Sequence, residues 1–188
     1  MKGKVILWVG IFLASCFAFT SCDNGSETGT IGSFQLKSDA FSNNQRLDTK
    51  YCYTGVTGGQ NISLPFNWVG APENAQSFAL VIYDPDGGDW IHWAIFNIPT
   101  DCSAISEGAS GKNMPEGSFE LDNEFGTSGY GGPEPPVGTG THRYIATLYA
   151  LNTSNISGIS GFRSYSSINT LLDEKIIEKT SIIGVYSR

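Results

Sequence analysis

Short apolar runs that alternate with clusters of Gly, Pro, Asn and Ser are the feature that most limits how this chain can fold. The runs recur at a spacing of roughly ten residues, which is typical of all-β domains. The clearest runs are 77–83, 90–98, 144–151 and 182–186. The first ends at the turn sequence Asp-Pro-Asp-Gly-Gly, and the third is rich in β-branched and aromatic residues. The sequence therefore predicts a mostly β fold with buried central strands.

One helix is predicted near residue 170. Ser166 or Ser167 would act as its N-cap, because serine side chains accept hydrogen bonds from the first turn. The apolar residues that recur at helical spacing are Ile168, Leu171, Leu172 and Ile176.

The start of the chain resembles a secretory signal. Lys2 and Lys4 precede the apolar segment 5–19, which is shorter than the ~20 residues of a membrane-spanning helix. We expect a signal peptide at 1–21, a flexible tether at 22–33 and one domain at 34–188.

Cys22 is the predicted lipidation site, because it follows a small residue and the chain then turns polar, as in bacterial lipoproteins. Cys16 fits the usual lipoprotein pattern better, but cleavage there would leave an apolar segment at the new end. An ordinary secretory peptide with an incidental cysteine is the remaining alternative. Each interpretation exports the protein to the cell envelope, lipid-anchored, periplasmic or extracellular, and its membrane contact would be the lipid anchor.

Cys52 and Cys102 would then lie in an oxidising compartment, where a disulfide between them is preferred over two buried thiols. The charge balance, 11 basic against 18 acidic residues, argues against nucleic acid as a partner.

Three segments contain nearly all the residues that could support chemistry. Asp84 and Asp86 end one apolar run, and His92 lies inside the aromatic run that follows. A Gly/Pro-rich loop, 131–138, leads into His142, which lies two residues before Tyr144 and so on the same face of a strand. The chain has only two histidines, so any imidazole-dependent site must use His92, His142 or both.

In collinear order, these segments resemble the phosphatidylethanolamine-binding protein family, in its bacterial Raf kinase inhibitor-like branch. The matching motifs are D-P-D at 84–86, W-x-H-W at 90–93, F-N-I-P at 96–99, N-E-F-G at 123–126, G-P-x-P-P-x-G at 132–138 and H-R-Y at 142–144. The resemblance covers about residues 34–188. It implies a β-sandwich with a large central antiparallel sheet, a smaller sheet and a C-terminal helix beside the site.

The resemblance also implies a pocket for small anions, including the phosphate of phospholipid head groups. Transferred to this sequence, its ligand-binding residues are Asp84, Asp86, Trp90, His92, Pro135, Pro136, His142 and Tyr144. The histidine rings and the tyrosine hydroxyl would donate hydrogen bonds to an oxyanion, and Asp84 would hold one histidine in the donating tautomer. Trp90 and the Pro135-Pro136 loop would form walls. Asp86 could instead serve only as a turn residue.

Two departures from the family pattern concern the rim of this pocket. Gly87-Gly88 replaces the usual Ala-Pro, which should loosen the rim, and Glu134 stands where bacterial members often have Cys. A carboxylate that faces the ligand would weaken anion binding. Arg143 alternates to the other face of its strand, so a structural ion pair is expected for it.

Other functions remain alternatives. Some relatives inhibit or modulate a kinase or a protease, and bacterial relatives suggest a homodimer. A hydrolase could use the histidine pair, and Asp84, His92 and His142 are nominally a metal-binding set. However, no G-x-S-x-G elbow occurs and the histidines are far apart in sequence, so we expect no enzyme activity, metal or cofactor.

Overall fold

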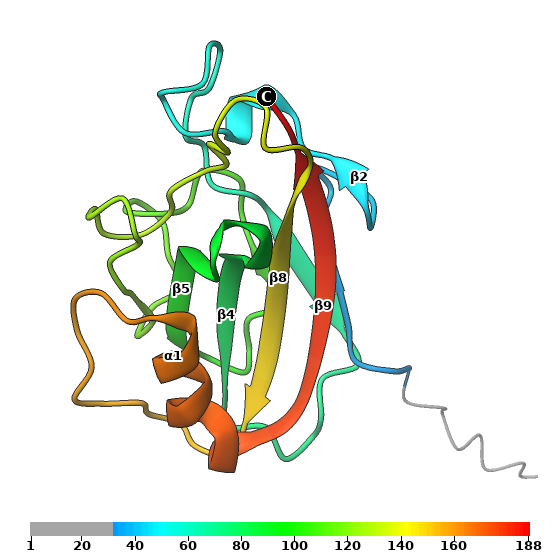
Figure 1. Ribbon diagram of the computed structural model, residues 1–188. Helices are drawn as coiled ribbons and strands as arrows, with labels where there is room; N and C mark the ends of the chain where they lie inside the picture. Colours follow the sequence, from blue (N-terminus) through cyan, green and yellow to red (C-terminus); the bar gives the residue numbers. More distant parts are fainter. Residues whose placement is uncertain (1–31) are drawn as a thin grey trace, which may run out of the picture. The chain divides into compact units, whose positions relative to one another are not determined.

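The computed structural model describes residues 32–188, which form two β-sheets and one α-helix (Figure 1). The six-stranded sheet has the order β2-β9-β8-β4-β5-β7, and the three-stranded sheet has the order β1-β3-β6. The strands of the larger sheet are β2 Gln45–Arg46, β4 Ser77–Asp84, β5 Trp90–Ile98, β7 Phe119–Glu120, β8 His142–Leu151 and β9 Ile176–Tyr186. Those of the smaller sheet are β1 Gln35–Lys37, β3 Phe66–Val69 and β6 Ala104–Ile105.

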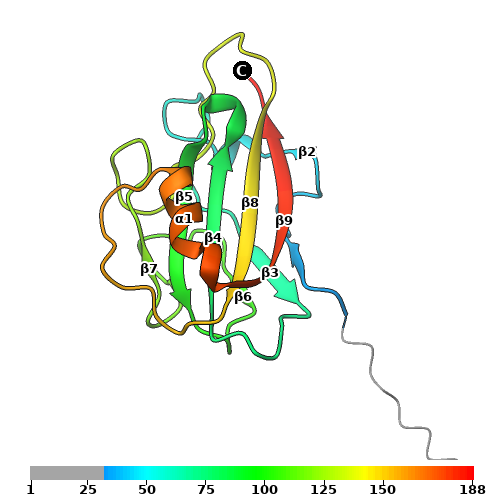
Figure 2. The same cartoon turned by 60° about the horizontal axis from the view of Figure 1, so that its bottom comes forward.

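The four apolar runs of the sequence become β4, β5, β8 and β9, the long strands of the larger sheet (Figure 2). These strands pair antiparallel, as expected. The short edge strand β2 pairs parallel with β9, so the sheet is mixed rather than wholly antiparallel. The smaller sheet is antiparallel throughout.

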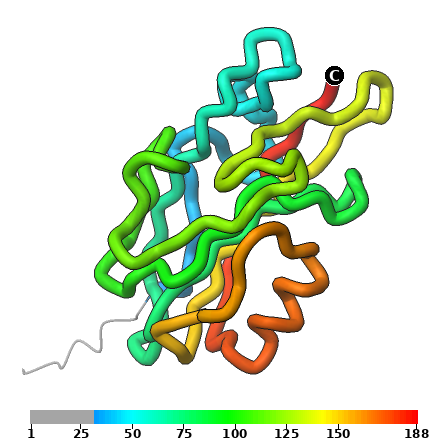
Figure 3. Tube along the Cα trace, turned by 90° about the vertical axis from the view of Figure 1, so that its left-hand side faces the viewer, coloured from blue at the N-terminus to red at the C-terminus, as the bar shows by residue number. Residues whose placement is uncertain are grey.

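Alternating side chains of the central strands fill two separate cores, one on each face of the larger sheet. In β4, Leu80 and Ile82 belong to the core under the smaller sheet, whereas Ala79 and Val81 belong to the core on the other face. Figure 3 shows the larger sheet nearly edge-on, with the helical segment (orange) on one side and the early strands (blue and teal) on the other. This two-faced burial explains why 77–83 is continuously apolar.

The helix α1, Tyr165–Leu172, forms in the predicted part of the sequence but is shorter than predicted. Ser164 is its N-cap, accepting from the backbone N–H of Ser167 at 3.3 Å. A 3-10 turn, Asp173–Lys175, follows, and Ile176 already belongs to β9. The helix buries Ile168 and Leu172 in the core opposite the smaller sheet. Its first residue, Tyr165, stacks on Tyr83, which directly precedes Asp84, at a ring-centroid distance of 3.7 Å.

The expected disulfide between Cys52 and Cys102 is not formed, and both thiols are free. Cys52 is buried directly after a 3-10 turn, Thr49–Tyr51, at the Trp90 end of β5. Cys102 lies in the turn beyond Ile98, the other end of that strand. A strand rises ~3.3 Å per residue, so the two cysteines are too far apart for the Cα separation of about 7 Å or less that a disulfide needs.

The signal peptide, Cys16, Cys22 and most of the expected tether lie outside the described residues. Within 32–188, no helix has the length and apolar character needed to cross a bilayer.

Candidate functional site

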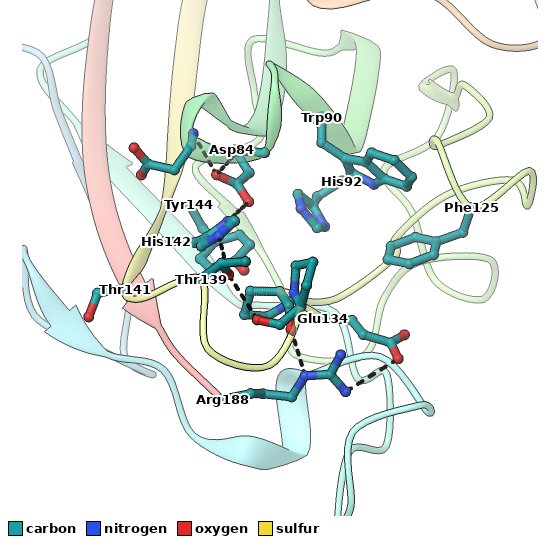
Figure 4. Close-up of a pocket in the computed structure, with 14 residues that line it drawn as sticks. Asp84, Trp90, His92, Phe125, Glu134, Thr139, Thr141, His142, Tyr144 and Arg188 are labelled. Carbon is teal, nitrogen blue, oxygen red and sulfur yellow. Dashed lines mark hydrogen bonds and ion pairs between the residues drawn. The ribbon is translucent and has the colours of Figure 1, made fainter.

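A pocket of about 850 Å³ lies where β4 ends and where β5 and β8 begin (Figure 4). It brings together all eight residues predicted for the ligand site: Asp84, Asp86, Trp90, His92, Pro135, Pro136, His142 and Tyr144. It adds Gly87, which was expected at the rim, and four residues that were assigned no site role: Phe125, Thr139, Thr141 and Arg188. Glu134, whose orientation the sequence left open, lines it as well.

Asp84 is fixed by the turn that ends β4. Its Oδ1 accepts hydrogen bonds from the backbone N–H groups of Asp86 at 2.8 Å and Gly87 at 3.0 Å, as the N-cap of the 3-10 turn Pro85–Gly87. Its Oδ2 lies 2.6 Å from Nδ1 of His142. Both carboxylate oxygens are therefore occupied within the protein, and Asp84 is 4% exposed.

Both ring nitrogens of His142 are occupied too. Nδ1 contacts Asp84, and Nε2 lies 2.9 Å from the hydroxyl of Thr139. That hydroxyl donates its single hydrogen to the carbonyl of Pro136 at 2.8 Å, so it is placed to accept from Nε2. Asp84 is thus the partner of His142, rather than of His92.

A β-bulge places His92 in the pocket. Along β4, Ile82 pairs with Trp93 and Tyr83 pairs with Ile91, so His92 is skipped in the register. Bulges re-aim a side chain relative to the regular alternation. The ring of His92 meets the rings of Tyr144 and Phe125 edge-on, at centroid distances of 5.0 and 5.9 Å.

The protonation of His92 differs from the expectation. Its Nδ1 lies 2.6 Å from the carbonyl oxygen of Gly131, which can only accept, so Nδ1 carries a hydrogen. Burial lowers the pKa of His92 to about 4, although the backbone of Gly131 and the charge of Asp84 oppose that shift. The ring is therefore neutral near pH 7, and it cannot donate a charge-assisted hydrogen bond there.

Two buried donors of the pocket have no hydrogen-bond partner among the described residues: the indole Nε1 of Trp90 and the hydroxyl of Tyr144. Burial also raises the pKa of Tyr144 far above its usual value, which keeps the hydroxyl protonated. Leaving such a group unpaired costs about 1–3 kcal/mol. Trp90 was predicted only as an apolar wall, a role that Phe125 shares by packing edge-on against it at 5.4 Å.

Asp86 lines the rim but is paired with Arg143. The guanidinium donates from Nε to Oδ2 at 2.9 Å and from Nη2 to Oδ1 at 2.8 Å. This pairing lowers the pKa of Asp86 to about 2. The expected structural ion pair of Arg143 is confirmed, and its partner is Asp86.

Arg188 crosses the rim between Glu134 and the Pro135 carbonyl. Its Nε donates to that carbonyl at 2.6 Å, and its Nη1 lies 3.5 Å from a carboxylate oxygen of Glu134 (Figure 4). Glu134 therefore faces the pocket with its charge compensated. Phe125 belongs to a motif of the family resemblance, whereas no pattern in the sequence pointed to Thr139 or Arg188.

Within residues 32–188, no group of three His, Cys, Asp or Glu side chains could hold a metal ion. Thr139, His142 and Asp84 follow the order nucleophile, base and orienting acid that hydrolases use. The Thr139 hydroxyl, however, donates its one hydrogen to the carbonyl of Pro136, so that hydrogen is not directed at His142 as a nucleophile–base pair requires.

A family model described as "Phosphatidylethanolamine-binding protein" matches residues 37–187. A "UPF0098 protein" of Methanothermobacter thermautotrophicus is 36% identical over 156 residues, which cover 81% of this chain and 98% of that protein. The crystal structure of Escherichia coli YbcL, described as a new member of the mammalian PEBP family, aligns with a TM-score of 0.77 at 31% identity and covers 83% of this chain and 99% of that one.

A third relative has a name that refers to a lipid anchor. The Mycobacterium tuberculosis protein named "Putative lipoprotein LppC" is 40% identical over 95 residues, which cover 50% of this chain and 45% of that protein.

Proposed function

Because the chain belongs to the phosphatidylethanolamine-binding protein family, we propose that its pocket binds a small phosphate-containing anion, of the kind found in phospholipid head groups. The observation that carries this proposal is the pair of buried donors without partners, Trp90 Nε1 and the Tyr144 hydroxyl. An oxyanion supplies the acceptors that both donors lack.

The charges around the pocket are compatible with an anion, despite the acidic composition of the chain. Three carboxylates line it, and each has a cationic or histidine partner: His142 for Asp84, Arg143 for Asp86 and Arg188 for Glu134. An anion would therefore meet compensated pairs rather than free negative charges.

The ligand would be met in the cell envelope. The signal-like segment at 1–21 and Cys22 support export with a lipid anchor. The similarity to a protein named as a lipoprotein also supports a lipid anchor.

Isothermal titration with inorganic phosphate and with phosphoethanolamine tests the proposal. We expect binding to the wild-type protein and at least about tenfold weaker binding to Tyr144→Phe, because one charge-assisted hydrogen bond is lost. Tyr186→Phe is the matched control, since its hydroxyl contacts Thr49 at 3.4 Å and does not line the pocket. No heat with either ligand, or equal affinities for all three proteins, would overturn the proposal.

A further inference from the structure

His92 presents an acceptor, rather than a donor, to the pocket. Its Nδ1–H is committed to the Gly131 carbonyl at 2.6 Å. In a neutral imidazole the other nitrogen, Nε2, has a lone pair and no hydrogen. The ring lines the pocket and is 3% exposed, and no hydrogen bond links Nε2 to the described residues.

The other polar groups around His92 already have partners or are donors. Asp84 uses both oxygens, and His142 uses both nitrogens. Tyr144 and Trp90 provide donors, and Phe125 provides an apolar ring edge against His92. The charged groups at the rim, Glu134 and Arg188, are paired with each other. His92 Nε2 is thus an acceptor of the inner pocket that makes no hydrogen bond within residues 32–188.

A lone pair repels a bare oxyanion. For an anion to lie against Nε2, one hydrogen must stand between the ring and a ligand oxygen. That hydrogen can come from the ligand, as a P–OH group, or from protonation of the ring. A phosphate monoester takes up a proton with a pKa of about 6. The ring does so only at its lowered pKa of about 4, so the ligand is the easier carrier.

We propose that His92 makes the pocket selective for an oxyanion that carries a hydrogen: a monoprotonated phosphate monoester or inorganic phosphate. The P–OH group donates to His92 Nε2, while the remaining oxygens accept from Tyr144 and Trp90. Sulfate carries no such hydrogen near neutral pH, and neither does a phosphodiester, the form of phosphate in an intact phospholipid. This inference rests on the proposed function and narrows its ligand class.

The same logic predicts a pH dependence that belongs to the ligand. Above about pH 6, the monoprotonated fraction of a phosphate monoester falls up to tenfold per pH unit. The affinity should fall with it. Asp84, His142 and Tyr144 face His92 as well, but a change in the charge of any of them would alter the binding of sulfate and of a phosphate monoester together. The ratio of the two affinities therefore isolates the proton on the ligand.

The experiment is a titration of the wild-type protein at pH 6 and pH 8 with phosphate, phosphoethanolamine, sulfate, dimethyl phosphate and glycerophosphoethanolamine. At pH 6 we expect phosphate and phosphoethanolamine to bind at least about tenfold more tightly than the other three. At pH 8 the preference for phosphoethanolamine should shrink by more than tenfold, because the monoester loses its P–OH. Inorganic phosphate still carries one hydrogen at pH 8, as HPO₄²⁻, and should keep its preference over sulfate. Glycerophosphoethanolamine tests whether the ammonium group of phosphoethanolamine, rather than its P–OH, donates to His92, because it has the ammonium group but no P–OH.

The inference would be overturned, and the proposed function left standing, if sulfate or a diester bound as tightly as phosphate at pH 6. An affinity for phosphoethanolamine that does not change between pH 6 and pH 8, relative to that for sulfate, would overturn it as well. Binding of none of the five ligands would overturn the proposed function itself. As a second measurement, His92→Gln offers both an amide donor and an amide acceptor. It should reduce the preference for phosphate over sulfate, and an unchanged preference in a folded His92→Gln protein would also contradict the inference.

Discussion

Asp84 and His142 lie 2.6 Å apart in the wall of the pocket, and this contact joins the end of β4 to the start of β8. Asp84 is 4% exposed and His142 is 5% exposed. The same carboxylate holds the backbone of the turn Pro85–Gly87 through Oδ1. One side chain thus sets both the shape of the turn and the orientation of the imidazole.

Replacing Asp84 with Asn should destabilise the protein. The amide has one oxygen for three donors, and its NH₂ group would face a donor on one side. We expect the free energy of unfolding to fall by about 2–3 kcal/mol. Urea denaturation measures this loss, with the exposed Asp101→Asn as a control that should change stability by less than about 0.5 kcal/mol.

The Tyr144 hydroxyl should contribute nothing to the stability of the ligand-free protein. Since it has no partner, Tyr144→Phe should leave the free energy of unfolding unchanged or raise it by up to about 1 kcal/mol. Tyr130 is the contrasting buried phenol, because its hydroxyl donates to the Tyr51 carbonyl at 2.9 Å. Tyr130→Phe should cost about 1 kcal/mol in the same denaturation experiment. Equal losses for both variants would contradict the account of the pocket.

Buried, neutral His92 should make the protein less stable in mild acid. Its pKa is lowered to about 4 in the folded state, below the usual histidine value of 6.5. Between these values the unfolded chain binds the extra proton, so stability is fully present above pH 6.5 and falls as the pH approaches 4. The contribution of this group is at most about 3 kcal/mol. Denaturation curves at pH 7, 5.5 and 4.5 should show a weaker dependence for His92→Gln.

The ion pair of Asp86 and Arg143 should make stability depend on pH in a lower range than His92 does. The pKa of Asp86 is lowered to about 2, so its stabilisation is present above about pH 4 and is lost as the pH falls toward 2. Because the pair is partly exposed, we expect Asp86→Asn to cost no more than about 1 kcal/mol at pH 7. The difference between wild type and Asp86→Asn should vanish at pH 2, as measured by thermal unfolding at both pH values.

Cys52 and Cys102, the free thiols within residues 32–188, should react at different rates. Burial raises the pKa of Cys52 to about 11, whereas Cys102 is partly exposed. Because the thiolate is the reactive form, a maleimide should label Cys102 in the native protein and Cys52 only after unfolding. Peptide mass spectrometry identifies the labelled cysteines, and a Cys52–Cys102 cross-linked peptide would contradict the structure.

The sequence was sufficient to predict which strands and loops meet at the pocket. Apolar runs marked the long strands, and polar residues at their ends marked the site. The alternation along β8 correctly separated His142 and Tyr144 from Arg143, because side chains in a strand point to opposite faces in turn.

The contacts within the pocket could not be predicted in the same way. The partner of Asp84 depends on the register between β4 and β8, and the position of His92 depends on a bulge that skips one residue. Arg188 reaches the rim because β9 runs beside β8, which is a tertiary relationship. The apolar stripe of α1 fixed its buried side but did not determine which face of the sheet it covers.

The place of Trp90 has a practical consequence. Trp68 and Trp93, the other tryptophans within residues 32–188, are buried in the core under the smaller sheet and do not line the pocket. Occupation of the pocket would therefore alter the surroundings of one indole in particular, and with it the intrinsic fluorescence. The wild-type protein carries its own optical reporter, so ligands can be screened without labels.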